Sequence, residues 1–200
     1  MRRLRVGWPT RATTALVGLA LTALTAPLVA SSSAVSADPR SPYAGLEQRS
    51  IKALSTEQIG DLLTGRGMGL ALAAELNGYP GPTHVLDLAE ELSLTPDQAA
   101  RAEALRAEMS EAAAELGADI VRREAALDAL FASGAVELEA LHRQVSDLAR
   151  LQGELRFTHL RAHLAMRALL TPEQNAAYAR LRGYGGPAPA DHHRGGHDTH

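Results

Sequence analysis

The chain has 200 residues, of which 20 are lysine or arginine and 23 are aspartate or glutamate, and it contains no cysteine. Aromatic residues make up only 4% of the chain, whereas alanine and leucine, which are strong helix formers, are abundant. This composition predicts an all-α fold without disulfides, which must be stabilised by helix packing or by oligomerisation.

Residues 1–37 have the organisation of a signal peptide. A basic start is followed by an apolar run over 15–26 and by small residues that end at Ala37. The basic residues are Arg2, Arg3, Arg5 and Arg11. The apolar run is shorter than the roughly 20 residues of a spanning helix. We therefore expect export to the periplasm and cleavage after Ala37, with an uncleaved anchor as the alternative.

Removal of this segment makes the mature chain acidic. The first 37 residues contain four of the 20 basic residues and none of the 23 acidic ones, so residues 38–200 carry a net charge of −7 with neutral histidines. An acidic surface repels phosphate backbones and anionic lipids. We therefore expect no binding to nucleic acid or to a membrane surface.

The N-terminal part of the mature chain predicts short helices separated by turns. An extended arm is expected over 38–50, because Pro39, Pro42 and Gly45 interrupt any periodicity. The short helices expected after it cover 55–64, 70–76 and 84–92. Between the first two, Gly65, Gly67 and Gly69 predict a turn, not a phosphate-binding loop, since no strand precedes them.

Two long helices are predicted next, over 95–133 and 135–169, with a short connection at Ser133-Gly134. Apolar residues recur at intervals of three or four in both, which predicts an antiparallel hairpin with facing stripes. Gly117 and Gly153 inside these helices predict bends. A last helix is expected over 171–182, followed by a disordered tail over 183–200 that is rich in glycine, proline and histidine.

One motif occurs twice, at the starts of the first long helix and of the last helix. Residues 94–98 read LTPDQ and residues 170–174 read LTPEQ, and a degenerate copy, LSTEQ, covers 54–58. In each full copy threonine caps the helix, proline presets the backbone and the acid meets the positive end of the helix dipole. The motif residues are Leu94, Thr95, Gln98, Leu170, Thr171 and Gln174. Taken singly, each copy is also explained as an ordinary helix cap.

The paired motifs around a long hairpin resemble the LTxxQ proteins of bacterial periplasms, which include the Spy/CpxP group and the heavy-metal-resistance sensors of the CnrX and ZraP type. The resemblance covers about 84–182, and residues 151–174 look most like the metal-resistance branch. It implies an elongated four-helix hairpin domain that forms a curved homodimer, with 38–83 as an N-terminal extension. Spy-like members are ATP-independent chaperones of unfolded proteins, and CnrX-like members bind divalent metal and report it to a membrane-bound regulator.

The histidines favour metal binding, in a sensor or a buffer, as the alternative function. His159, His163 and Met166 share one helix face and could ligate zinc, nickel or copper, although that face is also the apolar stripe. The sensors carry a histidine where this chain has Ala162, and they use two early histidines where this chain offers only His84. The tail could bind metal weakly through His192, His193, His197 and His200, or could simply add solubility.

No catalytic pattern stands out in the sequence, so we expect a protein that is not an enzyme and requires no cofactor. The expected partners are unfolded envelope proteins, or alternatively a membrane-bound stress regulator. The apolar stripes of the two long helices are the predicted client surface, with Arg122, Arg123 and Arg156 as secondary contacts.

Overall fold

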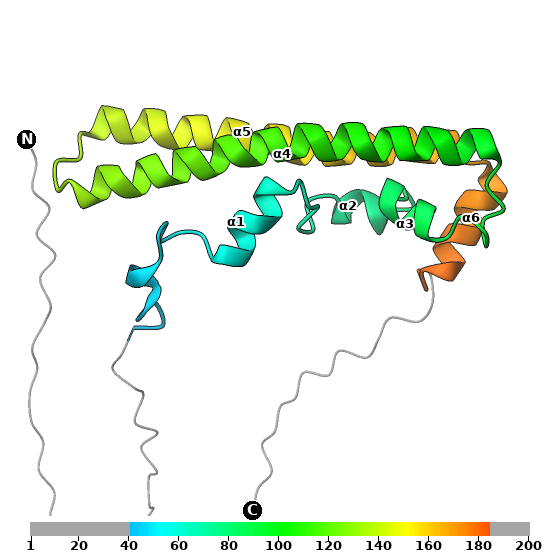
Figure 1. Cartoon of the computed structure of the whole chain (residues 1–200), viewed down its shortest axis with the longest axis horizontal. Helices are drawn as coiled ribbons and strands as arrows, with labels where there is room; N and C mark the ends of the chain where they lie inside the picture. The colour runs from blue at the N-terminus through cyan, green and yellow to red at the C-terminus, as the bar shows by residue number, and fades with distance from the viewer. Residues whose placement is uncertain (1–40, 185–200) are drawn as a thin grey trace, which may run out of the picture. The chain divides into compact units, whose positions relative to one another are not determined.

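The computed structural model describes residues 41–184, which contain helices and turns but no strand (Figure 1). The elements are η1 (Leu46–Gln48), α1 (Thr56–Leu63), α2 (Leu72–Glu75), α3 (Pro82–Asp87), α4 (Pro96–Ala132), α5 (Leu138–Leu169) and α6 (Pro172–Leu181). The all-α prediction is confirmed. The expected signal peptide and histidine tail lie outside the described residues, and none of the helices that are described is long and apolar enough to cross a bilayer.

The two long helices form the predicted hairpin. Helix α4 has 37 residues and α5 has 32, and they pack against each other along the molecule (Figure 1). The turn between them uses Gly134 in the left-handed region, at φ 69°. Helix α5 begins three residues later than predicted, at Leu138, because the backbone of its N-cap Glu137 is still extended.

Two local predictions are wrong. Residues 41–50 are not an extended arm but a series of turns that includes η1, and Gly45 permits this with φ 94°. Helix α3 begins at Pro82, not at His84, because proline fits the first helical position. It also ends earlier, at Asp87, and the turns that follow place Ser93 at φ 48°.

The segment 51–81, called the cover below, follows one face of the hairpin (Figure 1). Its helix α1 packs on α4 and its helix α2 packs on α5. Leu62 of α1 is only 6% exposed and lies in a core cluster with residues from both long helices. The other buried members of this cluster are Ala113, Ile120, Leu148, Leu151 and Leu155.

The predicted client surface is therefore largely inaccessible in this structure. Ile120, Leu148 and Leu155 of the apolar stripes are 3–5% exposed. These side chains pack between α4, α5 and the cover, so this part of the stripes belongs to the core, whereas Leu138 and Val145 near the hairpin turn are exposed.

A second cluster holds the opposite end of the hairpin together. Val85 of α3, Met166 of α5 and Tyr178 of α6 are each at most 1% exposed. Leu92, Ala102 and Leu170 complete the buried cluster. Helices α3, α4, α5 and α6 thus share one core, which confirms the expected four-helix domain.

Two glycines mark where the cover approaches the hairpin most closely. A Cβ atom on Gly117 would lie 2.0 Å from the carbonyl oxygen of Leu62, and one on Gly65 would lie 2.4 Å from that of Ser110. Gly117 therefore permits close backbone contact between α1 and α4, a role that the sequence did not suggest. By contrast, a Cβ on Gly153 would meet no atom of the described part of the chain within 4 Å.

Alanine substitution of the two glycines inside the long helices should change the stability of the protein in opposite directions. Gly117→Ala should destabilise the fold by about 1–3 kcal/mol, because α1 must move away from α4. Gly153→Ala should stabilise it by about 1 kcal/mol, because alanine has the higher helix propensity and the space is open. Urea unfolding followed by circular dichroism measures both, and equal effects of the two substitutions would contradict the assigned role of Gly117.

Candidate functional site

Three helices begin with the same capping box. The hydroxyls of Ser55, Thr95 and Thr171 accept hydrogen bonds from the backbone N–H groups of Gln58, Gln98 and Gln174 at 3.1–3.2 Å. Each glutamine Oε1 in turn accepts from the backbone N–H of its own cap residue at 2.8–3.1 Å. The degenerate copy therefore caps its helix as well as the two full copies do.

The two full copies are also joined to each other. The side-chain Nε2 of Gln98 donates to Oε1 of Gln174 at 2.8 Å, and Nε2 of Gln174 donates to Oε1 of Gln98 at 3.0 Å. Each Nε2 also donates to a backbone carbonyl, that of Leu169 for Gln98 at 3.1 Å and that of Leu92 for Gln174 at 3.2 Å. Both protons of each amide are thus used.

This reciprocal pair, called the glutamine pair below, ties three chain segments together. It fixes the start of α4 beside the start of α6 and satisfies a carbonyl at the end of α5. Leu170 is buried in the adjoining cluster and Leu94 packs against that cluster. The six motif residues therefore close the hairpin at one end.

A buried carboxylate lies close to this closed end. Glu75 of α2 is only 7% exposed. Its Oε1 accepts from the hydroxyls of Tyr178 at 2.5 Å and Tyr184 at 2.9 Å, and its Oε2 accepts from the backbone N–H of Gly81 at 3.1 Å. Burial, and after it the hydrogen bond to Glu75, raises the pKa of Tyr178 above its ordinary range. Glu75 thereby joins the cover to α6.

Basic side chains complete the surroundings of Glu75. His163 Nδ1 lies 3.6 Å from Glu75 Oε2 and 2.8 Å from the carbonyl oxygen of Tyr79, and Arg182 Nε lies 3.7 Å from Glu75 Oε1. His163 was expected at the solvated edge of the apolar stripe, but its side chain is only 12% exposed. The cover accounts for this difference, because residues 75–81 pack over that edge.

The sequence had not singled out Glu75. The available signal was that it is the one charged residue in the apolar run 70–76, LALAAEL. A lone acid in such a run indicates a buried, partnered carboxylate, but its partners Tyr178 and Tyr184 lie more than 100 positions away.

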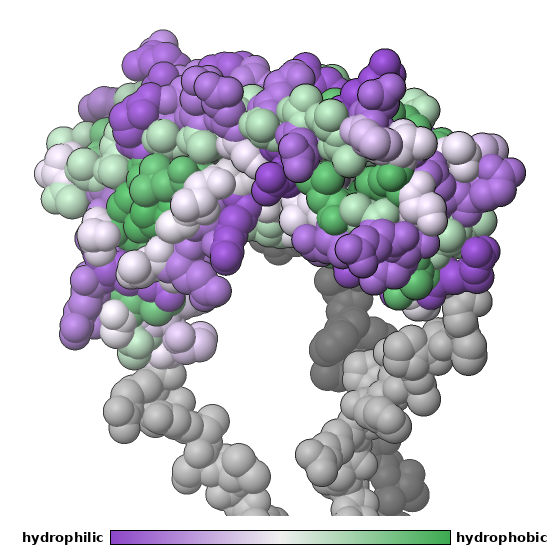
Figure 2. All heavy atoms as spheres, turned by 45° about the vertical axis from the view of Figure 1, so that its right-hand side comes forward, coloured by the Kyte–Doolittle hydropathy of each residue, from purple (hydrophilic) through white to green (hydrophobic). Residues whose placement is uncertain are grey.

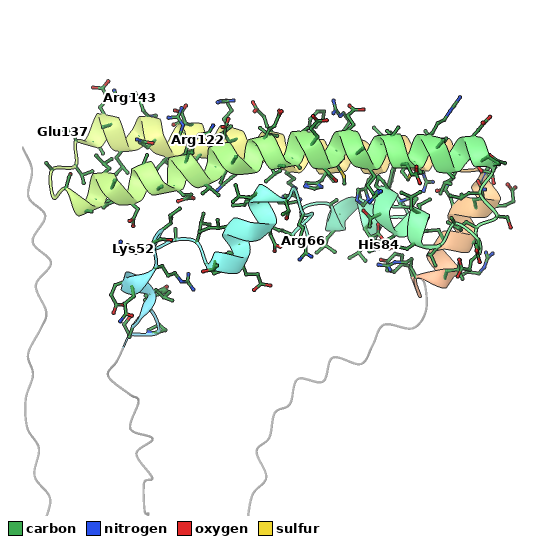
Figure 3. All side chains as sticks on the ribbon, viewed as in Figure 1. Lys52, Arg66, His84, Arg122, Glu137 and Arg143 are labelled. Carbon is green, nitrogen blue, oxygen red and sulfur yellow. The ribbon has the colours of Figure 1, made fainter. Side chains whose placement is uncertain are left out.

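A cleft of about 480 Å³ separates part of the cover from the hairpin. His84, His159 and His163 line it together with Glu75, and so do Met68 and Met109. Figure 3 shows His84 on the segment below the hairpin. The structure thus brings the early histidine to the same cleft as the two histidines of α5.

His159 lies deepest of the three histidines. It is 2% exposed, and its Nε2 has no hydrogen-bond partner among residues 41–184. Burial, and next the charge on His163, lowers the pKa of its imidazole below the ordinary value, so the ring stays neutral at neutral pH. A neutral ring with a free nitrogen is suited to ligate a metal or to accept a hydrogen bond.

The predicted ligand set is only partly assembled. Met166 shares a helix face with the histidines but is fully buried in the second cluster and does not line the cleft. Within residues 41–184 no three histidine, aspartate or glutamate side chains converge closely enough to hold a metal ion. The predicted tail ligands His192, His193, His197 and His200 lie outside the described residues.

Large apolar side chains remain exposed on the outer surface. On α5, Phe157 is 63% and Leu164 is 61% exposed. Near the hairpin turn the exposed residues are Phe131, Leu138 and Val145. Figure 2 shows apolar patches separated by hydrophilic residues on one face of the molecule.

Two of the arginines expected beside the client surface form ion pairs. Arg122 pairs with Asp119 on its own helix, and Arg123 contacts Asp147 of α5 at 3.0 Å. Arg156 lines a pocket at the edge of α1 together with Gly153.

These features define a class of protein: an all-α hairpin whose end is closed by two capping motifs joined through their glutamines. A family model described as LTXXQ motif family protein matches residues 83–182. The chain belongs to this family. Neither a curated protein nor a solved structure gives a significant match to the chain.

The glutamine pair can be tested with a double-mutant cycle. Gln98→Ala or Gln174→Ala alone should each destabilise the protein by about 1–3 kcal/mol, because the partner amide and a backbone carbonyl lose hydrogen bonds. The double variant should cost less than the sum by about 0.5–3 kcal/mol. Gln58→Ala is the matched control, since Gln58 shows only the capping contacts within 41–184. Additive effects of the two substitutions in urea unfolding would contradict the pairing.

Proposed function

We propose that this protein is a periplasmic chaperone of the Spy/CpxP type, which binds unfolding envelope proteins without a nucleotide. The observation that carries the proposal is the exposed apolar stripe on the outer face of α5. Phe157 and Leu164 are more than 60% exposed, and Leu160 lies between them on the same face. The opposite face of α5 is already buried by Leu155, Ala162 and Met166, so folding of the described residues leaves this stripe free.

The charges beside the stripe support reversible binding. Glu154 pairs with Arg150 at 2.8 Å and Arg161 pairs with Glu108 at 3.3 Å, all of them at least 49% exposed along the side chain. Apolar side chains that alternate with ion pairs offer a client several small contacts instead of one deep pocket. Such a surface suits unfolded segments of varied sequence, which present apolar and charged residues together.

The proposal includes export and assembly. Cleavage after Ala37 would release a mature chain with a net charge of −7, which disfavours nucleic acid as a partner. We further propose a homodimer that has no catalytic activity and requires no cofactor. A membrane-bound stress regulator is the alternative partner for the same surface.

A client-aggregation assay tests the proposal. The mature chain 38–200, at an equimolar ratio in EDTA, should suppress the light scattering of a chemically unfolded protein diluted into buffer. The double variant Phe157→Ser with Leu164→Ser should lose most of this effect, because it removes the apolar stripe.

Leu181→Ser is the matched control, because Leu181 is also a half-exposed leucine, 48% exposed, but lies on α6. Wild-type protein without effect on scattering would refute the chaperone function. Equal loss in the control and the double variant would refute the assignment to α5.

Metal binding is a second candidate function, favoured by the cleft that His84, His159 and His163 line, although within 41–184 their side chains do not converge on one point. The bond from His163 Nδ1 to the Tyr79 carbonyl is the kind of support that orients ligating imidazoles in metal sites. His159 offers a neutral ring with an unpaired nitrogen. Zinc, nickel and copper are the ions that this donor chemistry suits, and the tail histidines would supply further ligands.

Calorimetric titration with each of these ions, on the mature chain, tests the candidate. His159→Leu should weaken binding by at least tenfold if the cleft is the site, while deletion of 190–200 should do so if the tail is. His142→Leu is the control, since His142 is exposed on α5. Unchanged affinity in both test variants would exclude both sites.

A further inference from the structure

The cover depends on the hairpin for its own structure. Helix α1 has eight residues and α2 has four, and both are far shorter than the roughly 12–15 residues an isolated helix needs. Gly65 and Gly69, between them, have φ of 67° and 75°. A segment of this kind has few contacts of its own and belongs to the part of a protein that opens first.

Contacts along its length hold the cover, including those that His163 and Arg167 of α5 make with Tyr79 and Gly78. Lys52 Nζ pairs with Asp128 Oδ2 of α4 at 3.0 Å, and Figure 3 shows Lys52 at the start of this segment. Leu62 inserts into the first core cluster. Glu75 fastens the far end through Tyr178 and Tyr184. Between them the packing is incomplete, since a pocket of about 470 Å³ lies at the edge of α1, between Leu54, Leu70 and Leu155.

The hairpin is closed without the cover. The glutamine pair joins α4, α5 and α6 and involves no residue before Leu92. The match to the family model begins at residue 83, just after the cover ends. The cover is therefore an addition to a domain that has its own closure.

We propose that the cover is displaceable and that the groove beneath it, between α4 and α5, binds an amphipathic helical segment of a client in place of α1. The resident helix shows what the groove accepts. Leu62 packs in one cluster with Ala113, Ile120 and Leu151, and its own backbone lies directly on Gly117. A client helix with a leucine on its apolar face meets the same requirements.

The inference rests on the proposed chaperone function and adds a second, regulated surface to it. With the cover in place, clients meet only the outer stripe of α5. With the cover lifted, they also reach the apolar side chains of the first cluster. The cover thus limits how much apolar surface the protein exposes when no client is present.

A single covalent clamp tests the inference, because Lys52 is the only lysine in the chain. A water-soluble carbodiimide activates the Asp128 carboxylate, and the amine of Lys52, 3.0 Å away, displaces the activated group to form an amide. The carbodiimide takes up the water that is lost and leaves as a urea. Peptide mass spectrometry identifies the cross-linked product.

The clamped mature chain should suppress client aggregation at least threefold less than the uncoupled chain. The control is Asp128→Asn treated in the same way, which carries the same modification of other carboxylates but cannot form the clamp and should keep its untreated activity. Equal suppression by fully clamped and uncoupled protein would overturn the inference.

Amide hydrogen exchange separates this inference from the proposed function. In the uncoupled chain, amides of α1 and α2 should exchange together and at least tenfold faster than those in the middle of α4 and α5, and the clamp should slow them selectively. Exchange of the cover only together with the hairpin would overturn displacement, whether or not the chain suppresses aggregation. If the uncoupled chain opens its cover but does not suppress aggregation, client binding in the groove is refuted, whereas the opening of the cover is established.

Discussion

The hydrogen bonds between Gln98 and Gln174 fix the closed end of the hairpin, on which the second core cluster and the attachment of Glu75 depend. Each amide caps its own helix through Oε1 and reaches the other amide through Nε2, so the starts of α4 and α6 cannot separate without the loss of both hydrogen bonds between the glutamines. The end of α5 is held by the same amides. Tyr178 consequently enters the second cluster and lies within reach of Glu75. The closed end of the hairpin therefore positions Tyr178, to which Glu75 of the cover is hydrogen-bonded.

Sequence patterns over a few residues predicted the features of the fold that depend on neighbouring residues, namely the helix caps and the apolar faces of the helices. Threonine, proline and glutamine at the starts of α4 and α6 predicted the caps, and the spacing of apolar residues predicted the hairpin. The pairing of Gln98 with Gln174 and of Glu75 with Tyr178 could not be predicted in this way, because each joins residues more than 70 positions apart. The same limit applies to Gly117, whose neighbour is a backbone carbonyl of α1.

The histidines show what a helical-wheel projection predicts. It gives the face on which a residue lies but not the space that this face borders. It placed His159, His163 and Met166 on one face, and all three do point away from the outer stripe of α5. The wheel could not distinguish the cleft from the core, so it grouped Met166 with two residues that line a different space. It also could not show that α3 brings His84 to that cleft.

The short connection between α2 and α3 has a consequence for competition. Because residues 76–81 tether the cover to α3, the cover meets its groove in an intramolecular reaction, and its effective concentration is on the order of millimolar. In the displacement that we propose, a free client helix would compete against that concentration whatever the amount of protein. The length of the tether would therefore set a threshold affinity for the proposed groove, and segments that bind more weakly would be left to the proposed outer stripe.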